Sequence, residues 1–259
     1  MRLGFVGTGE IASAMVTGLS SSGAAPHAIR LSPRNHAIAA ELANRFQGVS
    51  IASSNQDVLD YCETVVIAGR PQVVRSALSE LRFRPDHRVI SVVSSLSLRS
   101  VSDLVAPATR VTRVVPLPSI AQRLGPIALY PADPVVGDLV ATLGTLFAVE
   151  TESEFDAMCA ATATIASYFA FTDRVASWLA RNSVSESQAR DYVARIFWGL
   201  TTVAVGAPER SFHSLASDHA TAGGINEQFL RCLVERGILE SVSEGLDAVM
   251  HRIRVASQK

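Results

Sequence analysis

Short runs of aliphatic and β-branched residues alternate with amphipathic segments through the first half of the chain. The runs have the length of buried strands, and the segments between them carry apolar residues at the spacing of a helix. Strands that alternate with helices predict a parallel sheet with helices on both of its faces. The expected strands are residues 2–6, 28–31, 49–52, 64–68, 89–93 and 111–115, with a first helix ending at residue 19 and a second over 35–46.

The pattern changes near Val149, and from Glu152 onward helical periodicity replaces the strand-like runs. We therefore predict an α/β fold in two parts, an α/β domain over residues 1–149 and an all-helical domain over residues 150–259. A Ser-x-x-Glu sequence from Ser183 to Glu186 predicts a capping box at the start of the second helix of the helical domain. The helices expected there are residues 154–179, 185–205, 227–235 and 239–253.

Composition narrows the function classes. Hydrophobic residues make up 48% of the 259 residues and charged residues 18%, which is typical of a compact chain and not of a disordered one. The formal net charge of −1 gives no overall attraction to nucleic acid or to an anionic membrane. We therefore expect small molecules or a second copy of the chain as partners.

Cysteine usage and the start of the sequence bear on location. The three cysteines, Cys62, Cys159 and Cys232, are widely spaced and form no Cys-x-x-Cys pair, so free thiols are expected, with neither a disulfide framework nor a metal site. Met1 leads directly into an apolar run without the features of a signal peptide, and no apolar run has the length of a bilayer span. These observations predict a cytoplasmic protein.

A glycine pattern of nucleotide-binding folds follows the first expected strand. Residues 7–12 read Gly-Thr-Gly-Glu-Ile-Ala, a Gly-x-Gly-x-x-Ala sequence that opens the first helix. In such a turn Gly7 permits the tight bend, Gly9 lets the backbone approach a pyrophosphate, and Ala12 permits close packing of helix on strand. The helix N-terminus offers N–H groups and partial positive charge to the phosphates. The sequence therefore predicts a Rossmann domain, with Gly7, Thr8, Gly9, Glu10 and Ile11 at the cofactor.

The end of the second expected strand bears on the choice of cofactor. NAD-preferring folds usually carry an acidic residue there, whereas this chain has Ser32, Arg34 and Asn35. A guanidinium suits a 2′-phosphate, so NADP(H) is preferred over NAD(H). The alternative is that Arg34 only begins an exposed helix.

These residues resemble the pyrroline-5-carboxylate reductase family, and the resemblance runs through nearly the whole chain. Residues 4–9, Gly-Phe-Val-Gly-Thr-Gly, are similar to the family's opening strand and turn, and Ser32-Pro33-Arg34 is similar to its NADP-phosphate loop. Residues 68–72 resemble its Ala-Val-Lys-Pro-Gln sequence, and residues 90–94 and 113–116 match its next two strand ends. The resemblance implies further cofactor contacts from Asn55, Ala68, Arg70, Pro71 and Ser94.

The helical half continues the resemblance. Residues 221–224, Thr-Ala-Gly-Gly, resemble the family's Ser-Pro-Gly-Gly substrate loop, and residues 162–168 its Ser-Gly-Ser-Gly-Pro-Ala-Tyr segment. The family implies a homodimer formed by the helical domain, with an interface that completes the active sites. We expect the loop glycines to offer backbone N–H groups to the substrate. The expected catalytic residues are Thr164, Tyr168 and Asn226, and the expected substrate-binding residues are Thr162, Ala222, Gly223, Gly224 and Ile225.

The chain differs from the family pattern on the substrate side. Ile225-Asn226 stands where the family has a small residue or threonine and then threonine, and residues 162–168 lack both family glycines and the proline. Reduction of a protonated C=N bond needs mainly positioning and exclusion of water, and the changed substrate side fits a reductase of a related imine. We therefore predict an NADPH-dependent reductase of a cyclic imine such as pyrroline-5-carboxylate, which would be reduced to proline.

Two other functions are open at this point. A non-catalytic, NADP-binding regulatory protein would retain the cofactor residues and tolerate the altered substrate loop. An enzyme like the β-hydroxyacid dehydrogenases would share both halves of the fold, but those enzymes use an interior catalytic lysine. The only lysine here is Lys259, so the chemistry disfavours them.

Overall fold

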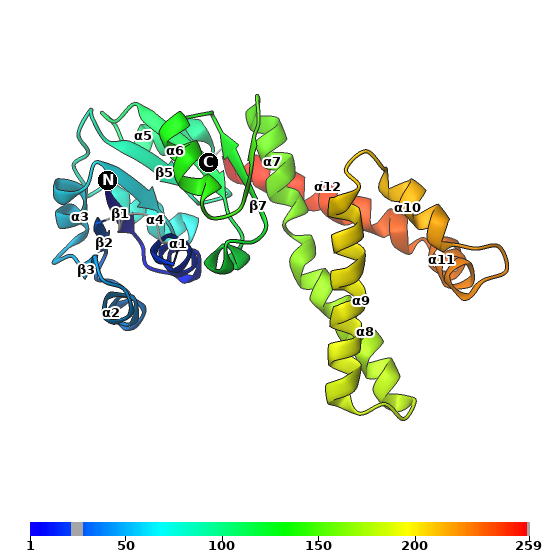
Figure 1. Ribbon diagram of the computed structural model, residues 1–259. Coiled ribbons are helices and arrows are strands. Elements are labelled where there is room, and N and C mark those ends of the chain that lie inside the picture. The colour runs from blue at the N-terminus through cyan, green and yellow to red at the C-terminus, as the bar shows by residue number, and fades with distance from the viewer. Residues whose placement is uncertain (22–27, 258–259) are drawn as a thin grey trace. The chain divides into compact units, whose positions relative to one another are not determined.

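The computed structural model describes residues 1–21 and 28–257. Eight strands form one sheet in the order β3-β2-β1-β4-β5-β6-β7-β8 (Figure 1). All neighbouring strands are parallel except β6 and β7, which are antiparallel. The strands are β1 (Arg2–Val6), β2 (Ala28–Leu31), β3 (Val49–Ile51), β4 (Thr64–Ile67), β5 (Arg88–Ser91), β6 (Arg110–Val115), β7 (Pro126–Tyr130) and β8 (Thr145–Ala148).

Helices follow most strands and then form the rest of the chain without further strands in residues 149–257. Those associated with the sheet are α1 (Glu10–Ser20), α2 (His36–Arg45), α3 (Asn55–Tyr61), α4 (Pro71–Leu78), α5 (Leu98–Leu104), the 3-10 helix η1 (Pro118–Gln122), α6 (Pro134–Ala141) and α7 (Glu152–Ala161). The later ones are α8 (Thr164–Arg181), α9 (Glu186–Gly206), α10 (Phe212–His219), α11 (Ile225–Glu235) and α12 (Ile238–Ser257).

Two apolar clusters lie on the opposite faces of the sheet, as the alternation of strands and helices predicts. On one face Leu3 and Phe5 of β1 pack with buried residues of α1, α2 and α6. On the other face Val65 and Ile67 of β4 pack with buried residues of α3, α4 and α5. All four residues of β4 are buried. A central parallel strand is covered on both faces, which explains the apolar run that begins at Val65.

The order of the strands fixes where a ligand can bind. The chain passes from β1 outward to β3, then returns to the other side of β1 with β4. The strand order thus reverses between β1 and β4, so the loops after these two strands lead away from each other at the carboxyl edge of the sheet. Open α/β sheets bind their ligands at the point where the strand order reverses. The loop after β1 is the Gly7–Gly9 turn.

Several predicted elements differ from the structure. The sequence analysis missed β7, β8, α6 and α10, and the antiparallel β7 makes the sheet mostly parallel. The helix predicted over 154–179 is two helices, α7 and α8, separated at residues 162–163. The predicted Ser183–Glu186 capping box is wrong, because Ser183 has a positive φ of 70° and Ser185 is the N-cap that accepts from the Gln188 N–H.

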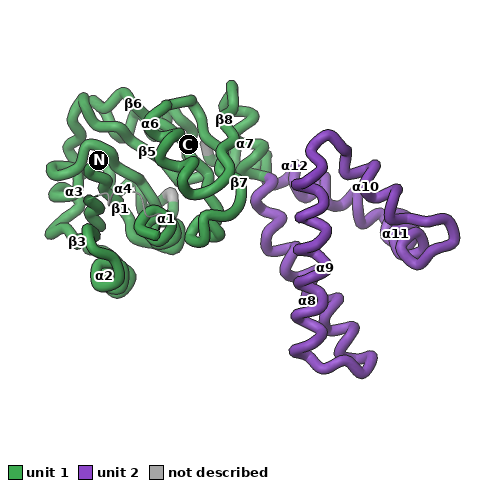
Figure 2. Tube along the Cα trace, in the orientation of Figure 1, with its two compact units in different colours: residues 1–160, 250–259 green, residues 161–249 purple. Residues whose placement is uncertain are grey.

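The chain divides into two compact units, residues 1–160 with 250–259 and residues 161–249 (Figure 2). The division differs from the predicted boundary at residue 149, since α7 and the end of α12 belong to the first unit. No helix among the described residues has the length and apolar character needed to cross a membrane.

Candidate active site

Gly7 makes the tight turn between β1 and α1. Its φ is +97°, and a Cβ atom there would lie 1.9 Å from the carbonyl oxygen of Ala68, at the end of β4. The fold itself therefore requires glycine at this position, because any side chain would collide with the neighbouring strand.

At Gly9 neither the backbone conformation nor the packing requires glycine. Its φ of −102° suits any residue, and a Cβ atom there would have no atom within 4 Å. Gly9 is the N-cap of α1 and provides no side-chain cap, so the first turn of α1, with Glu10 and Ile11, presents its N–H groups to open space. A helix N-terminus with free space before it is suited to an anionic group such as a pyrophosphate.

Ser32 shapes this turn from the end of β2. It is fully buried, and its Oγ accepts a hydrogen bond from the Gly7 N–H at 3.0 Å. The hydroxyl of Thr8, also buried, donates to the Ser32 carbonyl oxygen at 3.0 Å. Ser32 and Thr8 therefore hold the turn in place, and a direct contact of either side chain with a cofactor stays a prediction.

A cavity of about 390 Å³ is lined by residues that follow β2 and β3 and by residues of α4 and its C-terminal end. Arg34 lines it and is exposed, and it has no ion-pair partner in residues 1–21 and 28–257. Asn55, the first residue of α3, lines the same cavity. Its other lining residues are Ser54, Gln56, Ser76, Ala77, Glu80 and Leu81.

The charges and hydrogen bonds of this cavity suit a phosphorylated ribose. The Gln56 side chain fixes one wall, because its Oε1 accepts from the Arg82 N–H at 2.9 Å and its Nε2 donates to the Arg82 carbonyl at 3.2 Å. Arg34 forms no ion pair within residues 1–21 and 28–257, and Glu80 is a carboxylate in the same lining. Asn35 is the N-cap of α2 without a side-chain cap hydrogen bond, which leaves its amide available to a ligand.

The remaining predicted cofactor residues lie at the carboxyl ends of β4 and β5. Ala68 is buried, Arg70 is exposed and precedes α4 as its N-cap, and Pro71 begins that helix. Ser94 is exposed three residues after the end of β5. The Gly7–Gly9 turn, the Arg34 cavity and these strand ends follow one edge of the sheet, so the residues present fit a dinucleotide.

Arg113, Glu152 and Asp156 form an ion-pair cluster that contacts the backbone of Ser94. The Arg113 side chain, on β6, is 1% exposed. Its Nη1 donates to Glu152 Oε1 at 2.6 Å and to Asp156 Oδ1 at 2.9 Å, and its Nη2 donates to the Ser94 carbonyl oxygen at 2.9 Å. Its Cζ lies 4.4 Å from the centre of the Phe155 ring. The sequence analysis did not identify this cluster; its one signal is a second arginine, Arg113, among the valines of β6.

The predicted substrate residues all belong to the second unit. Thr162 lies between α7 and α8, and the hydroxyl of Thr164 donates to the Ala161 carbonyl at 2.8 Å. Tyr168 is partly exposed on α8, and its ring makes an edge contact with Phe197 at 5.7 Å. Among the described residues no hydrogen bond or ring contact joins Thr164 or Tyr168 to the loop at residues 221–225.

The Gly-Gly loop before α11 is closed internally, which corrects one expectation. The Gly223 N–H donates to Glu227 Oε2 at 2.7 Å, and the Gly224 N–H donates to the Thr221 carbonyl at 2.8 Å. The prediction that both glycines offer free N–H groups to a substrate is therefore wrong for this structure. Glu227, which the sequence analysis missed, is the third helical residue after the Gly224 N-cap, the position from which glutamate reaches back in a capping box.

Asn226, Ile225 and Ala222 surround this loop. The Asn226 Nδ2 donates to the carbonyl of His219 at 3.1 Å, so the amide connects α11 to the end of α10 and leaves its oxygen as the acceptor that could face a ligand. Ile225 is 83% exposed, and Ala222 is exposed as well. The loop is thus a rigid, solvent-facing turn with an apolar residue at its tip.

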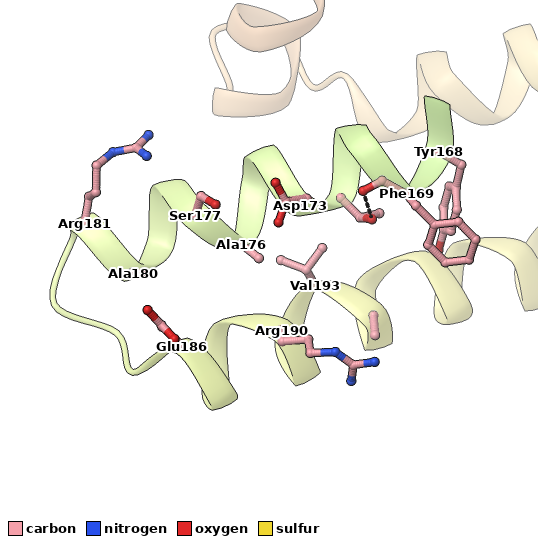
Figure 3. A pocket seen from close by; sticks show the side chains of 12 residues that line it. Tyr168, Phe169, Asp173, Ala176, Ser177, Ala180, Arg181, Glu186, Arg190 and Val193 are labelled. Atoms are coloured by element: carbon pink, nitrogen blue, oxygen red, sulfur yellow. Dashed lines mark hydrogen bonds between the residues drawn. The ribbon is translucent and has the colours of Figure 1, made fainter. Parts of the chain in front are cut away.

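A groove of about 700 Å³ runs between α8 and α9 (Figure 3). Tyr168 and Phe169 lie at one end of it, and Arg181 and Glu186 lie toward the other. Of the predicted site residues Tyr168 lines it, but no residue of the 221–226 loop and no predicted cofactor residue does. We therefore do not assign the groove to the substrate. In the described part of the chain no cluster of three or more histidine, cysteine, aspartate or glutamate residues is placed to hold a metal.

The fold and the Gly7–Gly9 turn define a Rossmann-type unit followed by a helical unit. Two family models match the chain: "NADP oxidoreductase coenzyme F420-dependent" matches residues 2–95, and "Pyrroline-5-carboxylate reductase dimerisation" matches residues 152–255. Together with the relatives described next, these matches show that the chain belongs to the pyrroline-5-carboxylate reductase family.

Two relatives illustrate the extent of the similarity. Pyrroline-5-carboxylate reductase 3 of Macaca fascicularis is 26% identical over 100% of this chain and 97% of its own length. Pyrroline-5-carboxylate reductase 3 of Rattus norvegicus is 35% identical, over a segment that covers 47% of this chain and 45% of its own length. The higher identity is thus confined to about half of the rat protein.

Solved structures share the fold. The 1-pyrroline-5-carboxylate reductase of Streptococcus pyogenes superposes with a TM-score of 0.86 at 24% identity, covering 100% of this chain and 99% of its own. The pyrroline carboxylate reductase of Plasmodium falciparum, solved with NADP bound, gives a TM-score of 0.82 at 17% identity, covering 99% and 98%.

Proposed function

We propose that this protein is an NADPH-dependent reductase of a cyclic imine such as pyrroline-5-carboxylate, which it converts to proline. The observation that carries the proposal is the Gly7–Gly9 turn, where one glycine is required by the fold and the other only by the space that a ligand needs. The family match of the helical half, and the similarity over the whole chain to a pyrroline-5-carboxylate reductase, support the same activity.

The proposed roles of the cofactor residues follow from their positions. The first turn of α1 binds the pyrophosphate through its N–H groups, and Ser32 keeps that turn in shape. When bound, NADPH supplies the hydride that reduces the C=N bond. Asn55 contacts the adenosine half, while Ala68, Arg70, Pro71 and Ser94 border the other half.

We propose NADP(H) in preference to NAD(H) because of Arg34. Its guanidinium is exposed, lacks an ion-pair partner among the described residues and lines the cavity beside Asn55. A 2′-phosphate would provide the anion that such a guanidinium lacks, and a bidentate pair of this kind is among the stronger hydrogen-bonded contacts. No acidic residue stands at residues 31–35 to bind an unmodified ribose.

We assign imine binding to the helical residues predicted from the sequence. Asn226 offers its amide oxygen, and the Tyr168 hydroxyl has no hydrogen-bond partner in the described part of the chain. Thr162, Thr164 and the exposed tip of the 222–225 loop complete the proposed set. Their task is to place the imine and exclude water, since a protonated C=N bond needs no further acid from the protein.

We also propose that the protein is a homodimer through its helical unit. Helix α8 has 18 residues and none of them is buried, although Phe169 and Trp178 lie on it. A helix this apolar and this exposed is typical of an interface, and the groove between α8 and α9 offers room for a helix of a second copy. A cytoplasmic location stays a prediction from the sequence.

The decisive experiment is oxidation of NADPH with a panel of cyclic imines, with and without a carboxylate. Saturable turnover of pyrroline-5-carboxylate to proline is expected. Saturable NADPH binding with no turnover across the panel would instead favour the regulatory protein.

The cofactor preference has its own test. Because a hydrogen-bonded charge pair is lost, Arg34→Ala should raise the dissociation constant of NADPH about 10-fold or more and leave that of NADH unchanged. Arg99→Ala, at an exposed arginine of α5, is the matched control. Equal effects on both cofactors would remove Arg34 from the 2′-phosphate site.

A further inference from the structure

The segment at residues 94–98, which joins β5 to α5 and includes the first residue of that helix, is held at both ends by groups outside it. At its start the Ser94 carbonyl oxygen accepts from Arg113 Nη2 at 2.9 Å. At its end the Leu98 N–H donates to Glu152 Oε1 at 2.5 Å, and that same oxygen accepts from Arg113 Nη1. A strand residue and a residue of α7 together therefore fix a loop that belongs to neither element.

The guanidinium that joins these contacts has a single orientation. Asp156 binds it at 2.9 Å, and the Phe155 ring packs against it. Its Nε is buried without a hydrogen-bond partner, so the cluster is not arranged to satisfy every donor. Two carboxyl groups share this one guanidinium, with Asp156 12% and Glu152 32% exposed.

Such a cluster is an inefficient way to stabilise a fold. Removing charges from water costs free energy, and well-packed apolar residues often stabilise a core as much or more. What an ion pair supplies that apolar residues cannot is a directional contact to a chosen backbone group. Here the chosen groups are the carbonyl of Ser94 and the N–H of Leu98.

The position of the loop indicates what this orientation serves. A dinucleotide lies across the carboxyl edge on both sides of the reversal between β1 and β4. The Arg34 cavity is on the β2 and β3 side, so the other half of the dinucleotide lies over the ends of β4, β5 and β6. Ser94 is exposed at that edge, with its carbonyl turned back to Arg113.

We propose that Arg113, Glu152 and Asp156 form a positioning cluster that clamps the loop at residues 94–98 and thereby orients the nicotinamide half of the cofactor. The proposal rests on the cofactor site proposed above. None of the three residues is a catalytic residue in this assignment, because each acts through the backbone of the loop.

The test variant is Glu152→Ala. Glu152 is the most exposed member of the cluster, with 32% of its side chain accessible, and Asp156 would still pair with Arg113. Glu152→Gln, which keeps an acceptor oxygen, should restore part of any loss. The matched control is Arg88→Met, which breaks the Arg88–Asp133 ion pair (2.8 Å) at the amino end of the same strand β5.

Four readouts separate positioning from general stability, and none needs an imine. Glu152→Ala should raise the dissociation constant of NADPH about 10-fold, because a charged hydrogen bond to the loop is lost. The dissociation constant of 2′,5′-ADP, which lacks the nicotinamide, should stay within about 2-fold because its site is distant. The change in NADPH fluorescence on binding should weaken, and hydrogen exchange at the Leu98 amide should accelerate.

The control should change none of these four readouts. If Glu152→Ala weakens 2′,5′-ADP as much as NADPH, or if Arg88→Met gives the same signature, the cluster is a general support of the fold and the proposal is overturned. Failure of the wild-type protein to bind NADPH at all would instead overturn the proposed cofactor site, and this inference with it. If the NADPH readouts of Glu152→Ala change as expected but the wild-type protein turns over no imine, this inference is supported and only the proposed reaction is overturned.

Discussion

The side chain of Ser32 accepts a hydrogen bond from the backbone N–H of Gly7 across 3.0 Å, and so joins the end of one strand to the turn that follows its neighbour. Ser32→Ala removes the acceptor and leaves the Gly7 N–H without a partner. The free energy of unfolding should fall by about 1–3 kcal/mol. The dissociation constant of NADPH should rise as well, because the turn that receives the pyrophosphate loses its support.

Urea denaturation and NADPH titration measure both effects of the Ser32 variant. Ser50→Ala is the matched control, since the Ser50 hydroxyl also bonds to the backbone of the sheet, at 3.3 Å to the Ile29 carbonyl, but is exposed. A Ser32→Ala protein with wild-type stability and wild-type affinity would contradict the supporting role.

The two glycines of the turn should separate fold from function. Gly7→Ala places a Cβ atom against the Ala68 carbonyl at a positive φ, so it should lower the free energy of unfolding by about 3 kcal/mol or more. Gly9→Ala meets no neighbouring atom, so its thermal midpoint should match the wild type while NADPH binding is lost. Differential scanning fluorimetry with and without NADPH distinguishes the two. Normal NADPH binding by Gly9→Ala would remove the pyrophosphate from this turn.

The Gly-Gly loop before α11 should affect the imine and not the cofactor. A Cβ atom at Gly224 would lie 2.8 Å from the Thr221 carbonyl, so Gly224→Val must displace the loop that carries Ile225 and Asn226. The KM for the imine should rise, and the dissociation constant of NADPH should be unchanged. Gly245→Ala, at a glycine of α12 with no neighbour within 4 Å of its Cβ position, is the control. Equal losses for both ligands would make the loop a structural element.

His87 predicts a specific pH dependence of stability. Its Nδ1 accepts from the Arg84 N–H and its Nε2 donates to the Leu59 carbonyl, so the fully buried ring is neutral. Burial, the largest cause, lowers the pKa of His87 in the folded protein. The folded state therefore binds fewer protons than the unfolded state, and stability is lost as the pH falls through the unfolded pKa of about 6.5.

Urea midpoints at pH 7.5 and pH 5.5 test this contribution. The slope from one such histidine is at most about 1.4 kcal/mol per pH unit, and it should be absent in His87→Gln. His36→Gln changes an exposed histidine and should keep the wild-type slope. An unchanged slope in His87→Gln would show that another group titrates in this range.

The sequence predicted those parts of the molecule in which local chemistry and fold require the same residues. The Gly7–Gly9 turn needs glycine for its backbone, and β4 needs an apolar run because both of its faces are covered. The edge strand β8 was missed because it is mostly exposed, so no burial pattern marks it. The interruption between α7 and α8 was missed because neither glycine nor proline marks it, and apolar spacing continues across Thr162.

The site contacts were less predictable because they depend on residues far apart in the chain. The partners of Arg113 lie 39 and 43 positions away, at Glu152 and Asp156. The same limit applies to Ser32, whose role at Gly7 spans 25 positions. Glu227 could have been found, since it stands three residues after Gly224 at the spacing of a capping box.

Both tryptophans of the chain, Trp178 and Trp198, lie on α8 and α9, and both side chains are more than half exposed. The Rossmann unit contains none, so the intrinsic tryptophan emission of this protein reports on the helical unit alone. Covering these indoles with a second copy would move their emission to shorter wavelength, and dilution would reverse the shift. Cofactor loading and subunit assembly can thus be followed in the same cuvette at separate wavelengths, without any added label.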